Sequence, residues 1–196
     1  MNSMQNTEQS KIRDAELVHR TLKNPNDFVE IIQHYQSLIR RYVNRLGCKN
    51  SNDADDLLQD IFLKVYINLN DYDADLPFSS WLYRIAHNET ISSFRKKSVR
   101  PMPVATEEEV YLFENIPDND NFFESLDIKI NGGILHRALA ELEEPYRDVI
   151  VLKFLEEKSY TEMSDILKIP IGTVGTLINR GKKRLKNILI SKNINI

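Results

Sequence analysis

Apolar positions recur with a helical period along the first half of the chain. Between 31 and 46 they fall every three or four residues, which predicts a helix that Asn26 or Asp27 caps and Gly47 ends. A short leading helix over 14–22 is expected to pack against it. Because no stretch sustains the alternation that is typical of strands, we predict an all-α protein.

Two further helices are predicted before residue 100. One is capped by Asn52 or Asp53, and a turn-rich segment, 70–77, separates it from another that opens near Ser79. The first of these helices carries a buried stripe made of Leu57, Leu58, Ile61, Phe62, Val65, Tyr66 and Leu69. The second turns inward Trp81, Leu82, Ile85, Ile91 and Phe94. Together the N-terminal helices are expected to form one bundle.

The helical period resumes in the last third of the chain, over 134–142 and 149–155, on either side of a break at Pro145. Segment 101–131 between the two halves holds three prolines and many acidic residues, a composition typical of a flexible tether. We therefore predict two small helical domains joined by a flexible acidic linker.

Two short helices around a tight turn are predicted near the C-terminus. Ser159 and Glu162 have the spacing of a capping box, and Pro170 ends that helix before a final one over 171–188. This arrangement is typical of a helix-turn-helix, although many helical hairpins have a basic face and bind no DNA. The second helix would present polar and cationic groups outward: Thr173, Thr176, Asn179, Arg180 and Lys183.

Charge is sorted along the chain, so the net charge of −3 conceals two basic blocks. Segment 53–75 has seven Asp against one Lys, whereas 84–100 has five Lys or Arg against one Glu. Segment 101–130 is acidic again, and after Asp165 there are seven basic residues and no acid. Two basic blocks with an acidic segment between them indicate two DNA-contacting surfaces.

Composition excludes several classes of function. The chain has 196 residues, of which 41% are hydrophobic, and it contains neither a membrane-length apolar run nor a signal peptide, so we expect a cytoplasmic protein. Cys48 is the single cysteine, and the four histidines never have metal-ligand spacing. We therefore expect no enzymatic activity, no metal and no cofactor.

Four segments resemble regions 2 and 4 of bacterial sigma factors of the small, extracytoplasmic-function (ECF) kind. The run YTEMSDILKIPIGTVGTLINRGKKRL resembles the helix-turn-helix of region 4, which reads the minus-thirty-five promoter element, and LHRALAELEEPYRDVIVLKFLEEKSY resembles the helices before it. NDADDLLQDIFLKVY resembles the polymerase-binding part of region 2, and FSSWLYRIAHNETISSFRKK the part that melts and reads the minus-ten element. The resemblance implies a region 2 domain over 10–100, a linker over 101–131 and a region 4 domain over 132–192.

The resemblance also implies roles for particular residues. Asp56, Gln59, Asp60 and Phe62 would bind the clamp helices of the polymerase's largest subunit, with Phe62 either an anchor or a core residue. The opened minus-ten strand would meet the loop 71–78 and the face formed by Arg84, Asn88, Ser92, Arg95 and Lys96. Trp81 and Phe78 could also stack on an unpaired base, although the helical spacing of Trp81 with Ile85 favours a core position for Trp81. Ser92 stands where the family often has Asp, and Gly175 and Leu177 where it often has Lys or Arg. Thr173, Thr176, Asn179, Arg180 and Lys183 would meet the minus-thirty-five element.

The family's partners follow from the same resemblance. They are core RNA polymerase, through its clamp helices and flap region, promoter DNA, and an anti-sigma factor. The free protein is expected to be a monomer without membrane insertion. Two rival hypotheses remain: a stand-alone helix-turn-helix regulator, which would bind DNA without polymerase, and a metal-dependent nuclease using Asp53, Asp55, Asp56 and Asp60. A stand-alone regulator would leave the acidic helix from Asp53 to Tyr66 without a role. The carboxylates of the supposed nuclease lie at a helix start, where capping and the helix dipole alone favour Asp.

Overall fold

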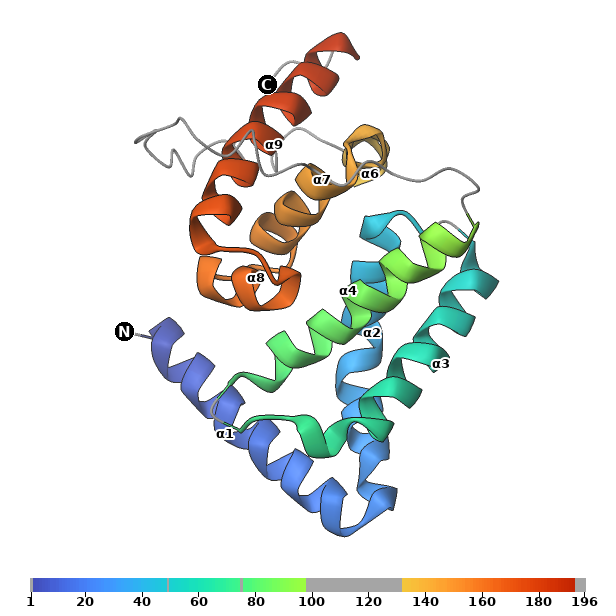
Figure 1. Cartoon of the computed structure of the whole chain (residues 1–196), viewed down its shortest axis with the longest axis vertical. Coiled ribbons are helices and arrows are strands. Elements are labelled where there is room, and N and C mark those ends of the chain that lie inside the picture. Colours follow the sequence, from blue (N-terminus) through green and yellow to red (C-terminus); the bar gives the residue numbers. More distant parts are fainter. Residues whose placement is uncertain (1, 49, 75, 98–131, 193–196) are drawn as a thin grey trace. The chain divides into compact units, whose positions relative to one another are not determined.

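The computed structural model describes residues 2–48, 50–74, 76–97 and 132–192. All regular elements in these ranges are helices, and they form two compact units, one built from α1 to α4 and the other from α6 to α9 (Figure 1). The expected all-α fold with two small helical domains is confirmed. The predicted linker, 101–131, lies outside the described residues.

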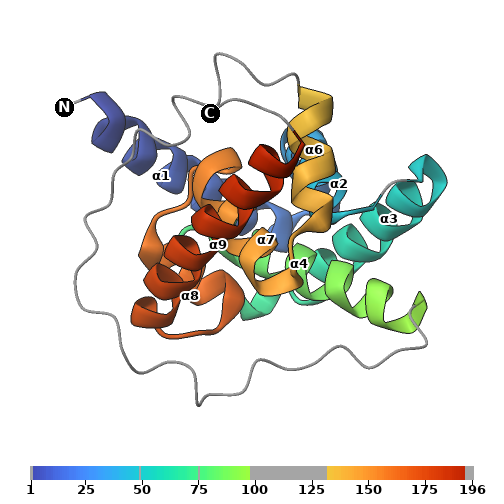
Figure 2. The same cartoon turned by 90° about the horizontal axis from the view of Figure 1, so that it is seen from above.

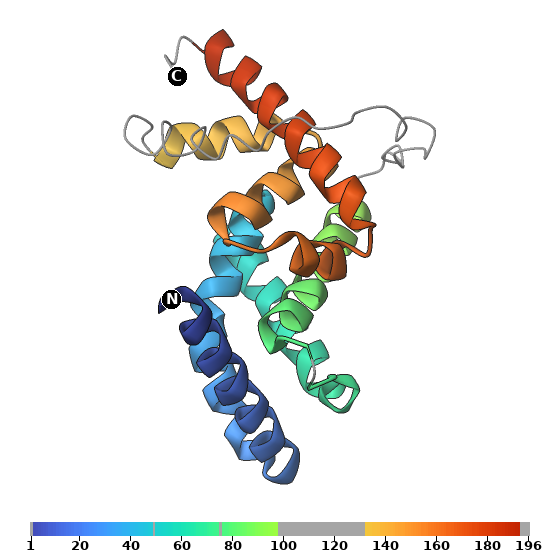
Figure 3. The ribbon, with the colours of Figure 1, turned by 90° about the vertical axis from the view of Figure 1, so that its left-hand side faces the viewer.

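The N-terminal unit begins with α1 (Asn2–Lys23), the short turn η1 (Pro25–Asp27) and α2 (Phe28–Leu46). Figure 3 shows α1 and α2 meeting at η1. The leading helix starts twelve residues before the predicted Asp14, because 2–13 contain no glycine or proline and many good helix formers.

The remaining elements of this unit are α3 (Ser51–Ile67), η2 (Leu69–Asp71) and α4 (Phe78–Lys97). The predicted cap of α3 is wrong by two or three residues, because the side chain of Asn50 accepts the N–H of Asn52 at the start of this helix. Asn24 likewise accepts the N–H of Asn26 at the start of η1, and α2 begins at Phe28, directly after Asp27, one of its two predicted caps.

The core of the N-terminal unit is formed by one face of each helix. Ile31, Ile39 and Tyr42 of α2 are fully buried with Ile61 and Val65 of α3, as the periodicity predicted. The predicted end of α2 is also confirmed, since Gly47 has a φ of 120°, a conformation that L side chains rarely adopt. One polar pair lies inside this core: the Tyr35 hydroxyl donates to Asp14 Oδ2 at 2.5 Å and ties α1 to α2.

The C-terminal unit contains α6 (Gly132–Glu141), α7 (Glu144–Ile150), a π-helical turn η4 (Val151–Leu155), α8 (Tyr160–Leu167) and α9 (Ile171–Ser191) (Figure 2). Pro145 lies in the first turn of α7, where its missing N–H costs nothing. Helices α7 and α9 approach closely at Gly181, where a Cβ would lie 3.0 Å from the Ile150 side chain.

The predicted helix-turn-helix is formed by α8 and α9. Ser159 and Glu162 make both bonds of the capping box, which confirms that prediction. Helix α8 ends at Lys168, which is left-handed with a φ of 56°, and Pro170 caps the start of α9. The Ser164 hydroxyl donates to the carbonyl oxygen of Ile169 at 2.6 Å, so the turn between the helices is held by a side chain of α8.

Candidate functional sites

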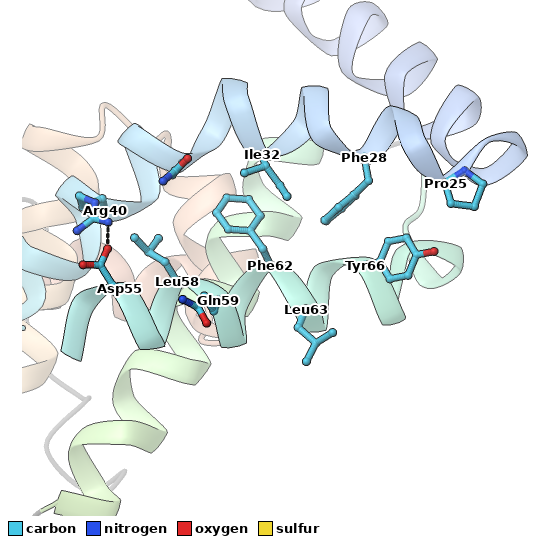
Figure 4. A pocket seen from close by; sticks show the side chains of 11 residues that line it. Pro25, Phe28, Ile32, Arg40, Asp55, Leu58, Gln59, Phe62, Leu63 and Tyr66 are labelled. Atoms are coloured by element: carbon cyan, nitrogen blue, oxygen red, sulfur yellow. Dashed lines mark hydrogen bonds and ion pairs between the residues drawn. The ribbon is translucent and has the colours of Figure 1, made fainter. Parts of the chain in front are cut away.

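A groove runs between α2 and α3 (Figure 4). It has a volume of about 520 Å³ and is lined mainly by apolar side chains, with Arg40 and Asp55 paired near one end. The other lining residues are Pro25, Phe28, Ile32, Gln36, Leu58, Gln59, Phe62, Leu63 and Tyr66. A concave apolar surface of this kind, bordered by charge, suits an amphipathic helix of another protein.

The acidic residues predicted on α3 lie beside this groove. Asp56, Gln59 and Asp60 are all exposed, as expected, and Gln59 also lines the groove. Phe62 is only 6% exposed, so it is a core residue whose ring also forms part of the groove wall. The core interpretation of Phe62 is therefore confirmed, and its role as an anchor for a partner stays a prediction.

Two groove residues were missed or misplaced by the sequence pattern. Tyr66 was predicted in the buried stripe of α3 but is 43% exposed, and its ring packs edge-on against Phe28 at 5.1 Å. Leu63 lies off the predicted stripe and is 57% exposed. The sequence did contain a signal for Leu63, because it is an apolar residue at a position where the helical period predicts a polar one. Both side chains add apolar surface to the wall of the groove.

A second candidate site lies along α4. Arg84 is half-buried, whereas Asn88 and Ser92, each four residues further on, are exposed, as are Arg95 and Lys96, three and four residues after Ser92. These residues therefore share one face of the helix, as predicted, and its exposed basic groups, Arg95 and Lys96, are suited to phosphate.

The aromatic residues in the first turn of α4 belong to the core. Phe78 and Trp81 are 1% and 5% exposed, so neither offers an open ring to a base, and the core position favoured for Trp81 is confirmed. Tyr72 packs on both, at 5.2 Å from Phe78 and 5.8 Å from Trp81, and joins the loop after η2 to the first turn of α4.

A third candidate site lies on α9. Thr173, Thr176, Asn179 and Arg180 are partly exposed and Lys183 is exposed, in agreement with the predicted recognition face. The Thr176 hydroxyl donates to the carbonyl oxygen of Gly172 at 3.0 Å, which leaves its lone pairs able to accept a bond from outside.

Not all basic residues of α9 are available to DNA to the same degree. Arg184 pairs with Glu143 and stacks over the Tyr146 ring at 4.4 Å, and Lys192 Nζ lies 2.6 Å from Glu141. Both cations thus have acidic partners elsewhere in the C-terminal unit, although their side chains stay partly exposed. Of the seven basic residues that the sequence places after Asp165, these two are the ones paired with Glu143 and Glu141.

Comparisons with known proteins match both units. The Sigma-70 region 2 family model matches residues 31–100, and the Sigma-70 region 4 model matches residues 132–185. The ECF RNA polymerase sigma factor SigW of Bacillus subtilis is 34% identical over 166 residues, which cover 83% of this chain and 88% of that protein. The ECF RNA polymerase sigma-E factor of Escherichia coli K12 is 30% identical over 189 residues, covering 90% and 94%.

Solved structures show the same fold. CnrH, in complex with the cytosolic domain of CnrY, matches with a TM-score of 0.66 at 22% identity and covers 91% of this chain and 97% of that one. The sigma factor RpoE of Bartonella quintana, in complex with the anti-sigma factor NepR, matches with a TM-score of 0.59 at 23% identity, covering 83% and 96%. Among the described residues, no helix is long and apolar enough to cross a membrane. The chain belongs to the ECF sigma factors of bacterial RNA polymerase, which direct transcription initiation.

Proposed function

We propose that the chain carries out this function through three separate surfaces, by binding and without catalysis, in the cytoplasm. Its domains would be region 2 over 10–100, a linker over 101–131 and region 4 over 132–192. The observation that carries the proposal is the coincidence of each surface with its region: the groove and the α4 face lie in the region 2 match, and α9 lies in the region 4 match.

The groove between α2 and α3 would receive the clamp helices of core RNA polymerase. Asp56 and Asp60 would meet basic groups of the partner, while Gln59, Phe62 and Leu63 would supply hydrogen bonding and apolar contact. Charge at the rim and apolar surface within match the usual division between a polar rim and an apolar centre. Because Asp55 is paired with Arg40, Asp56 and Asp60 are the stronger candidates for the partner's cations.

The two DNA surfaces divide the promoter between them. The α4 face made by Arg84, Asn88, Ser92, Arg95 and Lys96 would bind the opened minus-ten strand together with the loop after η2. Helix α9 would read the minus-thirty-five element through Thr173, Thr176, Asn179, Arg180 and Lys183. Because polymerase would hold both domains near one promoter, binding of one element would raise the effective concentration of the other domain at its own element. Two modest DNA contacts would then give a higher overall affinity for the promoter.

An anti-sigma factor is a further proposed partner. It is supported by the Bartonella quintana relative, whose solved structure contains one. The polymerase flap region would bind the region 4 domain, and the free protein would be a monomer. These assignments rest on family membership.

Core-binding affinity tests the proposed groove. The double variant Asp56→Lys and Asp60→Lys and the single variant Leu63→Asp should each weaken binding to purified core polymerase by about tenfold or more. Glu16→Lys reverses an exposed acid on α1 and should bind like the wild type. Equal affinity for all four proteins would place the docking surface elsewhere and overturn the proposal.

A further inference from the structure

The loop between η2 and α4 has an internal brace at Tyr72. The Tyr72 hydroxyl donates a hydrogen bond to the carbonyl oxygen of Leu76 at 2.7 Å. The N–H of Leu76 in turn donates to the carbonyl oxygen of Asp73 at 3.0 Å. The backbone of Leu76 is thus held from both sides, and its position depends on that of the Tyr72 ring.

That ring is itself held by the core. It packs edge-on against Phe78 with an interplanar angle of 86° and lies tilted against Trp81. Phe78 contacts Tyr35 at 5.6 Å, and Tyr35 donates to the buried Asp14. A continuous set of contacts therefore runs from α1 through α2 to the loop.

The hydroxyl is suited to act as a permanent donor. Burial, with the charges of Asp14 and Asp73, raises the pKa of Tyr72 to about 12, so the group keeps its proton at neutral pH. The protonated hydroxyl is thus committed to Leu76, and the ring packs on two aromatic neighbours while Tyr72 stays partly exposed.

The described residues beside this bond are open to solvent. Asp73 and Ala74 are exposed, and Leu76 is 40% exposed. An exposed leucine on a fixed turn provides an apolar surface against which an unstacked base can rest. Such a contact is strong only when the turn is already in its bound shape, since ordering it afterwards costs free energy.

Resting on the proposed role of this loop in binding the opened strand, we propose that Tyr72 is the positioning residue of the strand-binding turn. Its hydroxyl fixes the backbone of Leu76, and its ring does not contact the base. The buried Phe78 and Trp81 act as the support for that ring and not as stacking platforms.

The test uses holoenzyme assembled from core polymerase and the full chain. A pool of single-stranded oligonucleotides with randomised positions is selected with the wild type, and the dissociation rate of the most enriched strand is then measured. Three variants are compared: Tyr72→Phe, which keeps the ring and loses the bond; Tyr72→Leu, which loses both; and Tyr42→Phe. The last is the matched control, because Tyr42 loses a hydrogen bond of similar length, 3.1 Å to His87 Nδ1, in the same unit.

We expect Tyr72→Phe to release the strand about fivefold faster, the effect of one net hydrogen bond, with unchanged affinity for core polymerase. Tyr42→Phe should release it at the wild-type rate, and Tyr72→Phe should unfold at no lower temperature than Tyr42→Phe. A wild-type rate for Tyr72→Phe with fast release by Tyr72→Leu would mean that the ring itself stacks on the base, and would overturn the inference. Equal losses of strand and core binding would reduce Tyr72 to a general structural role. If the wild type enriches no strand at all, the proposed role of the loop fails first.

Discussion

The buried carboxyl of Asp148 on α7 should make the C-terminal unit less stable as the pH rises. Asp148 is 4% exposed, and burial raises its pKa from 3.8 to about 8, with Glu144 acting in the same direction and Arg147 opposing it. Between these two values the native protein holds a proton that the unfolded chain has lost. Stability is therefore greatest below the unfolded pKa and declines until the pH passes the folded one.

The dependence of the unfolding free energy on pH follows from one proton, which the native state binds and the unfolded chain has lost. The free energy of unfolding should fall by about 1.4 kcal/mol per pH unit, and so by about 2 to 3 kcal/mol between pH 5 and pH 7. Asp148→Asn keeps the shape of the side chain and removes the titration, so this part of the decline should be absent. The variant should equal the wild type near pH 4 and exceed it in stability at pH 7.

Urea unfolding followed by hydrogen exchange of the α7 and α9 amides measures this unit directly. Trp81 is the only tryptophan of the chain and belongs to the other unit, so its fluorescence serves as an internal control. Its transition should not respond to Asp148→Asn. The same pH slope in wild type and variant would refute the reasoning and assign the titration to another group.

Four further substitutions test the packing and capping. Gly181→Ala should destabilise the C-terminal unit by about 1 to 3 kcal/mol because the added Cβ would lie 3.0 Å from a side-chain carbon of α7, as exchange of the α9 amides would show. Gly175→Ala, whose Cβ meets only one ring carbon at 3.9 Å, should instead stabilise α9 by about 1 kcal/mol in the same experiment. Tyr35→Phe should cost the N-terminal unit about 1 to 3 kcal/mol in a fluorescence-detected urea titration, since Asp14 stays buried without that donor. Ser159→Ala should lose about 1 kcal/mol by breaking the capping box, and an unchanged unfolding midpoint would contradict that estimate.

The helical period was enough to predict most of the fold. Where an apolar stripe faces one packed neighbour, as from Ile31 to Leu46, periodicity and burial agree. The caps were harder, because several Asn and Asp compete at each helix start and the sequence does not say which side chain reaches the N–H groups. The π-helical turn η4 was not predicted, since its hydrogen-bond register leaves no mark in the pattern of apolar residues.

The candidate sites were predictable only in part. Exposed polar groups on one face, such as those of α4, follow from helical spacing alone. Tyr66 was misplaced because a tyrosine at a core-like position looks buried in the sequence, whereas the groove beside it leaves the ring open. The brace from Tyr72 to Leu76 and the pairing of Arg184 with Glu143 depend on tertiary positions that no local pattern contains.

Transcription from genomic DNA tests the central claim most directly. Sheared genomic DNA is transcribed by purified bacterial core polymerase with and without this chain, and the transcript starts are mapped. Discrete new starts should appear with the wild type, persist with Glu16→Lys and vanish with the double variant Asp56→Lys and Asp60→Lys. No new starts, together with tight and specific DNA binding by the chain alone, would contradict the account and favour a stand-alone regulator.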